Sequence, residues 1–103
     1  MDISQEELKE VLANNSIVVV DFWAPWCGPC RLMSATFSDF AENNPNVAIH
    51  KVDAADNEGV GQEYSVKSIP AFIYFKDGVE VARLGGRQSL TALQQKLEEV
   101  LNG

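Results

Sequence analysis

The feature that most constrains the fold is an apolar, largely β-branched run near the start of the chain. Residues 16–23 read SIVVVDFW, without the polar alternation of a strand that has one exposed face. A continuous run of this kind is typical of a strand inside a sheet that is covered on both faces. We therefore expect this chain to place helices on two sides of one sheet.

The rest of the sequence alternates helical and strand patterns that meet this requirement. We expect helices over residues 4–15, 30–44 and 89–103, a short helix or turn over 57–66, and strands over 17–22, 47–53, 71–75 and 79–84. Asp77-Gly78, between the last two strands, is typical of a two-residue hairpin turn. Strands separated by helices pair in parallel, and a hairpin adds antiparallel pairing. The prediction is an α/β fold, with a central mixed sheet of four to five strands flanked by helices on both faces.

Two of the helices carry further local signals. Ser4 and Glu7 have the spacing of a capping box at the start of the first helix. In the last helix, leucines recur at helical spacing, and we expect them to form its buried face: Leu90, Leu93, Leu97 and Leu101.

Length and composition indicate one soluble, compact domain over residues 1–103. The formal net charge of −7 makes nucleic acid and anionic membranes poor partners, because both favour basic surfaces. The apolar runs are shorter than a bilayer requires. The opening MDISQEELKEVL lacks the basic and apolar regions of a signal peptide, so we expect a cytoplasmic protein.

Residues 23–33, WAPWCGPCRLM, contain the only two cysteines of the chain. A structural disulfide between Cys27 and Cys30 would close a very short loop and would stabilise the fold little. A zinc site needs about four ligands, and the single histidine, His50, lies in a different predicted strand. Both alternatives stay open, but a redox-active dithiol with no bound metal fits the spacing better.

The position of the pair suggests how the two thiols differ. Cys27 falls at the expected start of a helix, where free backbone N–H groups favour an anion and lower the pKa of a thiol. Cys30 comes one turn later and is expected to be shielded, so Cys27 should attack and Cys30 should resolve. Pro29 fits the first helical turn, and Gly28 has no side chain to keep a partner's backbone away.

Three stretches together resemble the thioredoxin family. They are VDFWAPWCGPC, SIPAFIYFKDGVEV and the pair Gly85-Gly86, in the family's order. The resemblance implies a thioredoxin fold and a thiol–disulfide oxidoreductase that reduces disulfides in partner proteins. It also implies no cofactor beyond the Cys27–Cys30 pair, re-reduction by a thioredoxin reductase, and a monomer.

The resemblance assigns roles to two charged residues near the pair. Asp21 would be buried beneath the disulfide and would move the proton of Cys30, and Lys51 would be the lysine partner of that carboxylate. From the residues alone, each side chain is as well explained by ordinary solvation at a strand.

The resemblance also implies a docking surface for the partner protein. Trp26 would be exposed beside Cys27, the Ile69–Pro70 bond would be cis and lie against the disulfide, and Gly85 and Gly86 would keep the far wall of the groove low. Pairing of the backbone before Pro70 with an extended segment would resemble the addition of a strand. A trans bond is the ordinary alternative for Ile69–Pro70, and a core position is the ordinary alternative for a tryptophan.

The chain departs from the family in two places that bear on the fold. Only three residues precede Ser4, so the family's first strand should be a stub or absent. Ala35 stands where the family has a proline that kinks the second helix, so this helix should run straighter. Two other functions remain open: an oxidase or isomerase on the same fold, and a binding subunit whose thiols are idle.

Overall fold

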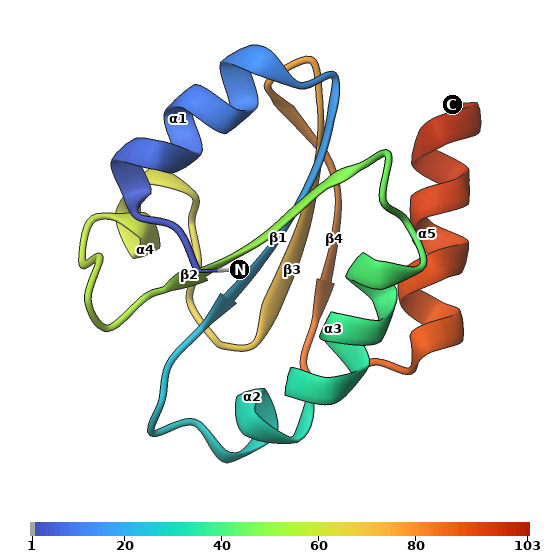
Figure 1. The fold of residues 1–103 in the computed structure, drawn as a ribbon. Coiled ribbons are helices and arrows are strands. Elements are labelled where there is room, and N and C mark those ends of the chain that lie inside the picture. The colour runs from blue at the N-terminus through green and yellow to red at the C-terminus, as the bar shows by residue number, and fades with distance from the viewer. Residues whose placement is uncertain (1) are drawn as a thin grey trace.

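A computed structural model describes residues 2–103, and one four-stranded sheet lies at its centre (Figure 1). The elements are α1 (Gln5–Asn14), β1 (Ile17–Trp23), α2 (Gly28–Leu32), α3 (Ser34–Glu42), β2 (Ala48–Asp53), α4 (Val60–Glu63), β3 (Ala71–Lys76), β4 (Val79–Gly85) and α5 (Leu90–Asn102). The strand order is β2-β1-β3-β4. Strand β1 pairs in parallel with β2 and antiparallel with β3, which forms a hairpin with β4. The predicted mixed sheet is confirmed.

Helices cover both faces of the sheet, as the apolar run of β1 requires. In Figure 1, α1 and α4 lie on one side and α3 and α5 on the other. Leu8 of α1 and Val60 of α4 belong to one apolar cluster, and Phe37 of α3 and Leu97 of α5 belong to the other. Every residue of β1 from 18 to 22 is buried between the two clusters. None of the helices in this described range is long and apolar enough to cross a membrane.

The expected local signals are present at the start of α1 and in the hairpin. Ser4 Oγ accepts a hydrogen bond from the Glu7 amide at 3.0 Å, and Glu7 Oε1 accepts one from the Ser4 amide at 2.8 Å. Asp77 and Gly78 have φ angles of 52° and 81°. Two successive positive φ angles are the conformation that joins strands with the natural twist of a hairpin.

Within the described residues, the N-terminal segment contributes a stub and no full strand. Asp2 forms an isolated parallel bridge with Lys51 of β2, and the Ile3 amide donates to the Lys51 carbonyl at 2.8 Å. The stub partly covers the outer edge of β2, which limits unwanted pairing with other chains.

The expectation of one straighter helix after Cys30 was wrong. The helix is interrupted at Met33, which separates α2 from α3 although Ala35 replaces the family's proline. The Met33 amide donates to both the Pro29 and Cys30 carbonyls, at 3.2 and 3.1 Å. A shared bond of this kind tightens the last turn toward a 3₁₀ helix. The break is therefore produced by local hydrogen bonding and does not need a proline.

The expected buried face of the last helix also needs one correction. Leu93, Leu97 and Val100 are the buried residues of α5, whereas Leu101 is 48% exposed. Successive residues of a helix turn by about 100°, so Leu101 falls beside the stripe that contains Val100. Leu90 lies at the border of the cluster and is partly buried.

This difference predicts unequal effects for two leucine substitutions in the same helix. Leu97→Ala should lower the free energy of unfolding by about 2–5 kcal/mol, because it leaves a cavity in the core. Leu101→Ala should lower it by about 0.5 kcal/mol or less, because the side chain is half exposed. Urea unfolding followed by circular dichroism measures both, and equal losses would contradict the described packing of α5.

Candidate functional site

The two cysteines lie where β1 ends and α2 begins. Cys27 is the N-cap residue of α2, and Cys30 lies inside the helix. They form a disulfide with their Cα atoms 5.3 Å apart. Cys27 Sγ accepts a hydrogen bond from the Cys30 amide at 3.2 Å. The first amides of a helix have no partners within it, so they stabilise negative charge on Cys27 and favour its thiolate.

Two loops that are distant in sequence meet the disulfide. Ile69 O lies 3.8 Å from Cys27 Sγ, and the Ile69–Pro70 peptide bond is cis, as the resemblance implied. Pro70 O accepts a hydrogen bond from the Gly86 amide at 2.9 Å. The structure therefore brings Ile69, Pro70 and the glycine pair together at the end of the sheet that carries Cys27.

The glycines and the proline beside the disulfide leave the site accessible. An added Cβ atom at Gly28 or Gly85 would meet no atom within 4 Å, so both positions face open space. Gly86 has a φ of +78°, a conformation that favours glycine. Pro29 is exposed in the first turn of α2. Proline has no backbone N–H, but N–H groups of the first turn have no partner within the helix, so no helical hydrogen bond is lost.

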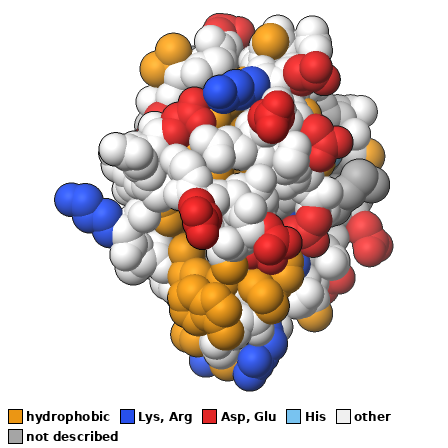
Figure 2. Space-filling view, turned by 90° about the vertical axis from the view of Figure 1, so that its left-hand side faces the viewer, with side chains coloured by type: hydrophobic (Ala, Val, Ile, Leu, Met, Phe, Trp, Pro, Cys, Tyr) orange, Lys and Arg blue, Asp and Glu red, His pale blue; other side chains and the backbone are white. Residues whose placement is uncertain are grey.

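An exposed apolar patch adjoins the site. Trp26 is 72% exposed, which confirms its expected place on the surface. With Val66 and Ile69 it lines a shallow hollow of about 230 Å³. Figure 2 shows hydrophobic side chains gathered at the lower end of one face, at the level of α2 in Figure 1, with acidic side chains above them. Such patches commonly mark sites of protein contact.

Both cysteine residues are buried in the oxidised state. Cys27 is 6% exposed and Cys30 3%, so exposure alone separates them little. Position separates them better, because Cys27 is the capping residue and its sulfur faces the Ile69 carbonyl. Cys30 is held within the first turn of α2.

Asp21 is the one charged residue among the buried side chains of residues 2–103, and it is 1% exposed. It lies on β1 between Lys51 of β2 and Phe72 of β3. Because side chains alternate along a strand, it shares the face of Val19, which α3 and α5 cover. Neither carboxyl oxygen has a hydrogen-bond partner in the described chain.

The environment of Asp21 places its titration near neutral pH. Burial raises the pKa of the carboxyl from 3.8 to about 7, the positive charge of Lys51 opposes this rise, and the negative charge of Asp2 adds to it. Burial has this effect because it disfavours the charged form. A carboxyl with such a pKa can exchange protons at physiological pH.

Lys51 acts on Asp21 at a distance and does not form an ion pair with it in the structure. Its Nζ atom lies 4.4 Å from the ring centroid of Trp23, a cation–π contact. The indole N–H of Trp23 donates to Asp2 Oδ1 at 2.6 Å. Sequence reasoning missed this chain of contacts, because Asp2 and Trp23 are far apart in sequence and carry no shared motif.

The single histidine of the chain, His50, lies outside the site. His50 lies in β2 and is partly buried, with Nδ1 unpaired within residues 2–103. Burial lowers its pKa. The described residues contain no cluster of three or more His, Cys, Asp or Glu side chains that could hold a metal ion.

Comparison with known proteins decides the family. The sequence model of the family named Thioredoxin matches residues 1–99. The chain belongs to the thioredoxin family. A thioredoxin from Chlamydia pneumoniae is 41% identical over 97 residues, which cover 91% of this chain and 94% of that protein.

Solved thioredoxin structures agree with the observed fold. Thioredoxin from Trypanosoma brucei brucei superposes with a TM-score of 0.90 at 28% identity and covers 100% of this chain and 91% of its own. A yeast structure, described as showing the thiol resolving mechanism of mitochondrial 1-Cys peroxiredoxin via glutathione and thioredoxin systems, has a TM-score of 0.87 at 26% identity. It covers 96% of this chain and 93% of its own. The chain has the thioredoxin fold and is a thiol–disulfide oxidoreductase, and this family uses its own cysteine pair without a cofactor.

The raised pKa of Asp21 predicts a pH-dependent gain in stability on Asp21→Asn. Between pH 4 and 7 the folded carboxyl holds a proton that the unfolded chain has released, so wild-type stability falls as pH rises. Three pKa units correspond to about 4 kcal/mol at most. In the oxidised protein, the variant's advantage in free energy of unfolding should therefore grow by up to this amount from pH 4 to pH 8.

Denaturant unfolding at a series of pH values measures this advantage. Asp39→Asn, on an exposed part of α3, is the matched control for the loss of one carboxyl. A constant difference between the wild type and Asp21→Asn would contradict the raised pKa.

Proposed function

We propose that this protein is a general reductant of disulfides in partner proteins, with Cys27 as the attacking and Cys30 as the resolving residue. The observation that carries the proposal is the placement of Cys27. It caps α2, its sulfur lies 3.8 Å from Ile69 O, and exposed Trp26 precedes it. A nucleophile at this position meets a docked partner before Cys30 does.

The proposed reaction transfers two electrons in two exchanges. The Cys27 thiolate attacks one sulfur of the partner's disulfide, a mixed disulfide forms, and the other sulfur leaves as a thiolate that takes up a proton. Cys30 then loses its proton and attacks Cys27 Sγ. The mixed disulfide breaks, the partner leaves as a dithiol, and Cys27–Cys30 becomes the disulfide present in the structure.

The docking surface of the proposal combines an apolar contact and a backbone contact. The partner would place an apolar side chain against Trp26 and the hollow beside it. An extended segment of the partner would run along Ile69, in the manner of an added strand. The open space at Gly28 and Gly85 would admit its backbone.

In this mechanism, Asp21 accepts the proton of Cys30 during the second exchange. Its burial, its lack of hydrogen-bond partners among residues 2–103 and its pKa of about 7 support this role. Lys51 would keep the carboxyl partly ionised at neutral pH, because its positive charge opposes the effect of burial.

We extend the proposal to the setting in which the protein works. Residues 1–103 would act as a single domain, as a cytoplasmic monomer that a thioredoxin reductase returns to the dithiol form. All described elements surround one sheet, which supports the single domain. The similar yeast structure concerns a peroxiredoxin, which suggests thiol peroxidases as one class of partner.

Unequal roles for the cysteines predict unequal trapping. Cys30→Ser should accumulate covalent mixed disulfides through Cys27, because the resolving thiol is gone. Cys27→Ser should trap almost none. Mass spectrometry after incubation with a disulfide-containing protein measures both, and equal trapping by the two variants would refute the assignment.

The proton role of Asp21 predicts which exchange depends on it. Asp21→Asn should slow release of the mixed disulfide more than its formation, because only release requires the proton of Cys30 to leave. Rapid mixing with a fluorescent protein substrate resolves the two phases. If formation alone slows, Asp21 does not serve Cys30.

A further inference from the structure

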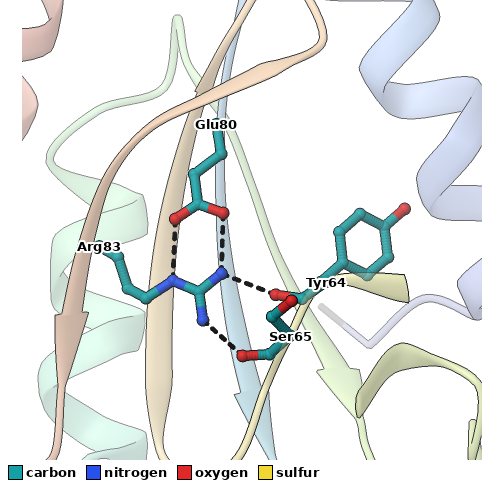
Figure 3. Close-up of polar contacts among 4 residues, drawn as sticks. All are labelled: Tyr64, Ser65, Glu80 and Arg83. Carbon is teal, nitrogen blue, oxygen red and sulfur yellow. Dashed lines mark hydrogen bonds and ion pairs between the residues drawn. The ribbon is translucent and has the colours of Figure 1, made fainter. Parts of the chain in front are cut away.

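Arg83 of the edge strand β4 holds a backbone segment that belongs to a different part of the chain (Figure 3). Its Nη2 atom donates to Tyr64 O at 2.6 Å, and its Nη1 atom donates to Ser65 O at 2.8 Å. Nε and Nη2 also bind the two carboxylate oxygens of Glu80, at 2.8 and 2.7 Å. The planar guanidinium therefore joins Glu80 on one side to two successive carbonyls on the other.

A β-bulge makes this arrangement possible. Residues three apart on a regular strand point to opposite faces of the sheet. In β4, however, Ala82 is opposite Tyr74 and Glu80 is opposite Phe75, so Val81 is an extra residue without a partner. The extra residue brings Glu80 and Arg83 to the same face.

The two carbonyls lie at a turn whose Tyr64 ring packs on Phe22 and Phe75 but whose backbone carbonyls lack backbone partners within the described chain. Tyr64 is the C-cap of α4, a helix of only four residues, and the last carbonyls of a helix lack partners within it. Ser65 has a φ of 54°, a left-handed conformation that costs energy for a residue other than glycine. Arg83 supplies the missing donors at this turn.

The turn leads directly into the docking loop, which we define as residues 66–69. Val66, Lys67 and Ile69 line the hollow beside Trp26. Within residues 2–103, the backbone of 67–69 makes no hydrogen bond, and Ile69 O lies 3.8 Å from the disulfide-bonded Cys27 Sγ. Val66 and Ile69 pack against the core, but in this part of the described chain the backbone of the loop is hydrogen-bonded at its two ends.

The two ends are held by different contacts. At the distal end, the Gly86 amide binds Pro70 O at 2.9 Å. At the proximal end, the Val66 amide binds Gly61 O at 3.0 Å, and Arg83 binds the two carbonyls just before Val66. Arg83 is thus the side chain that holds the backbone carbonyls at the proximal end, beside the core packing of Tyr64 and Val66.

We propose that Arg83 is a positioning residue for partner-protein binding: by holding the Tyr64 and Ser65 carbonyls, it fixes the docking loop in the shape that a protein substrate meets. The proposal rests on the proposed function, in which this loop contacts the partner. Arg83 touches neither cysteine, so it should govern reaction with protein disulfides and leave the reactivity of Cys27 unchanged.

Arg83→Met tests this proposal, because it removes every donor and retains an unbranched side chain. The pre-reduced protein is mixed with insulin, as a protein disulfide, and separately with a small disulfide reagent. The second-order rate constant for insulin should fall about tenfold, the effect of losing one or two charge-assisted hydrogen bonds. The rate constant for the small disulfide should stay within twofold of the wild-type value. The reduction potential of the cysteine pair should equal that of the wild type within error.

Three further measurements separate positioning from general damage. Arg83→Lys can make only some of the hydrogen bonds of the guanidinium, so its rate constant for insulin should fall by an intermediate amount. If Arg83→Met does not fold, Arg83→Lys tests the proposal in its place. Lys96→Met removes another exposed ion pair with three-residue spacing, Lys96–Glu99 on α5, and should change neither rate. Hydrogen exchange of the Val66 amide should be faster in Arg83→Met and unchanged in Lys96→Met.

Several results would overturn the proposal. An equal loss with both disulfides would mean that Arg83 acts on the cysteines or on the whole fold, and no loss with insulin would mean that the contact is inert. Failure of the wild-type protein to reduce insulin would instead contradict the proposed function, so the two failures are distinguishable.

Discussion

Burial of β1 on both faces determines where the helices and the site lie. Five consecutive residues of this strand are inaccessible to solvent, and the fourth of them is Asp21. Two layers of helices are needed to cover the strand, and the same layers remove water from the carboxyl. The stability of the fold and the proton chemistry of the site therefore oppose each other: the packing that stabilises the sheet makes an ionised Asp21 costly.

The site assembles where several connections meet at one end of that strand. The α2 N-terminus presents Cys27, the loop before β3 presents Ile69, and the start of the β4–α5 connection presents Gly86. Each connection is fixed by few bonds. Single contacts such as Gly86 to Pro70, and Arg83 to the turn after α4, accordingly have a large share in shaping the surface that a partner meets.

Local patterns in the sequence were enough for the features that depend on neighbouring residues. The two-sided strand, the Asp77-Gly78 turn and the place of Cys27 at a helix start all follow from spacing and residue type. The break at Met33 could not be predicted from spacing, since it depends on how one amide shares two carbonyls. The exposure of Leu101 follows from which side of α5 packs on the core, with Val100 buried in its place.

The functional residues divide in the same way. Asp21 and the cis bond before Pro70 came from the family resemblance, because no local pattern distinguishes a buried aspartate from a solvated one. The partnership of Glu80 and Arg83 was hidden by the bulge in β4, because regular alternation puts these side chains on opposite faces. A one-residue change in pairing register is a long-range property that the sequence of a single strand does not reveal.

The claim that packing sets the chemistry of Asp21 is tested most directly by its own titration. Carbon-detected NMR of the Asp21 side-chain carboxyl in the oxidised protein, from pH 3 to pH 10, measures the pKa without reference to activity or stability. The structure predicts a midpoint near 7, about 3 units above the ordinary value for aspartate. A midpoint near 4 would show that water reaches the carboxyl in solution, and it would contradict the proposed coupling between the buried strand and the proton of Cys30.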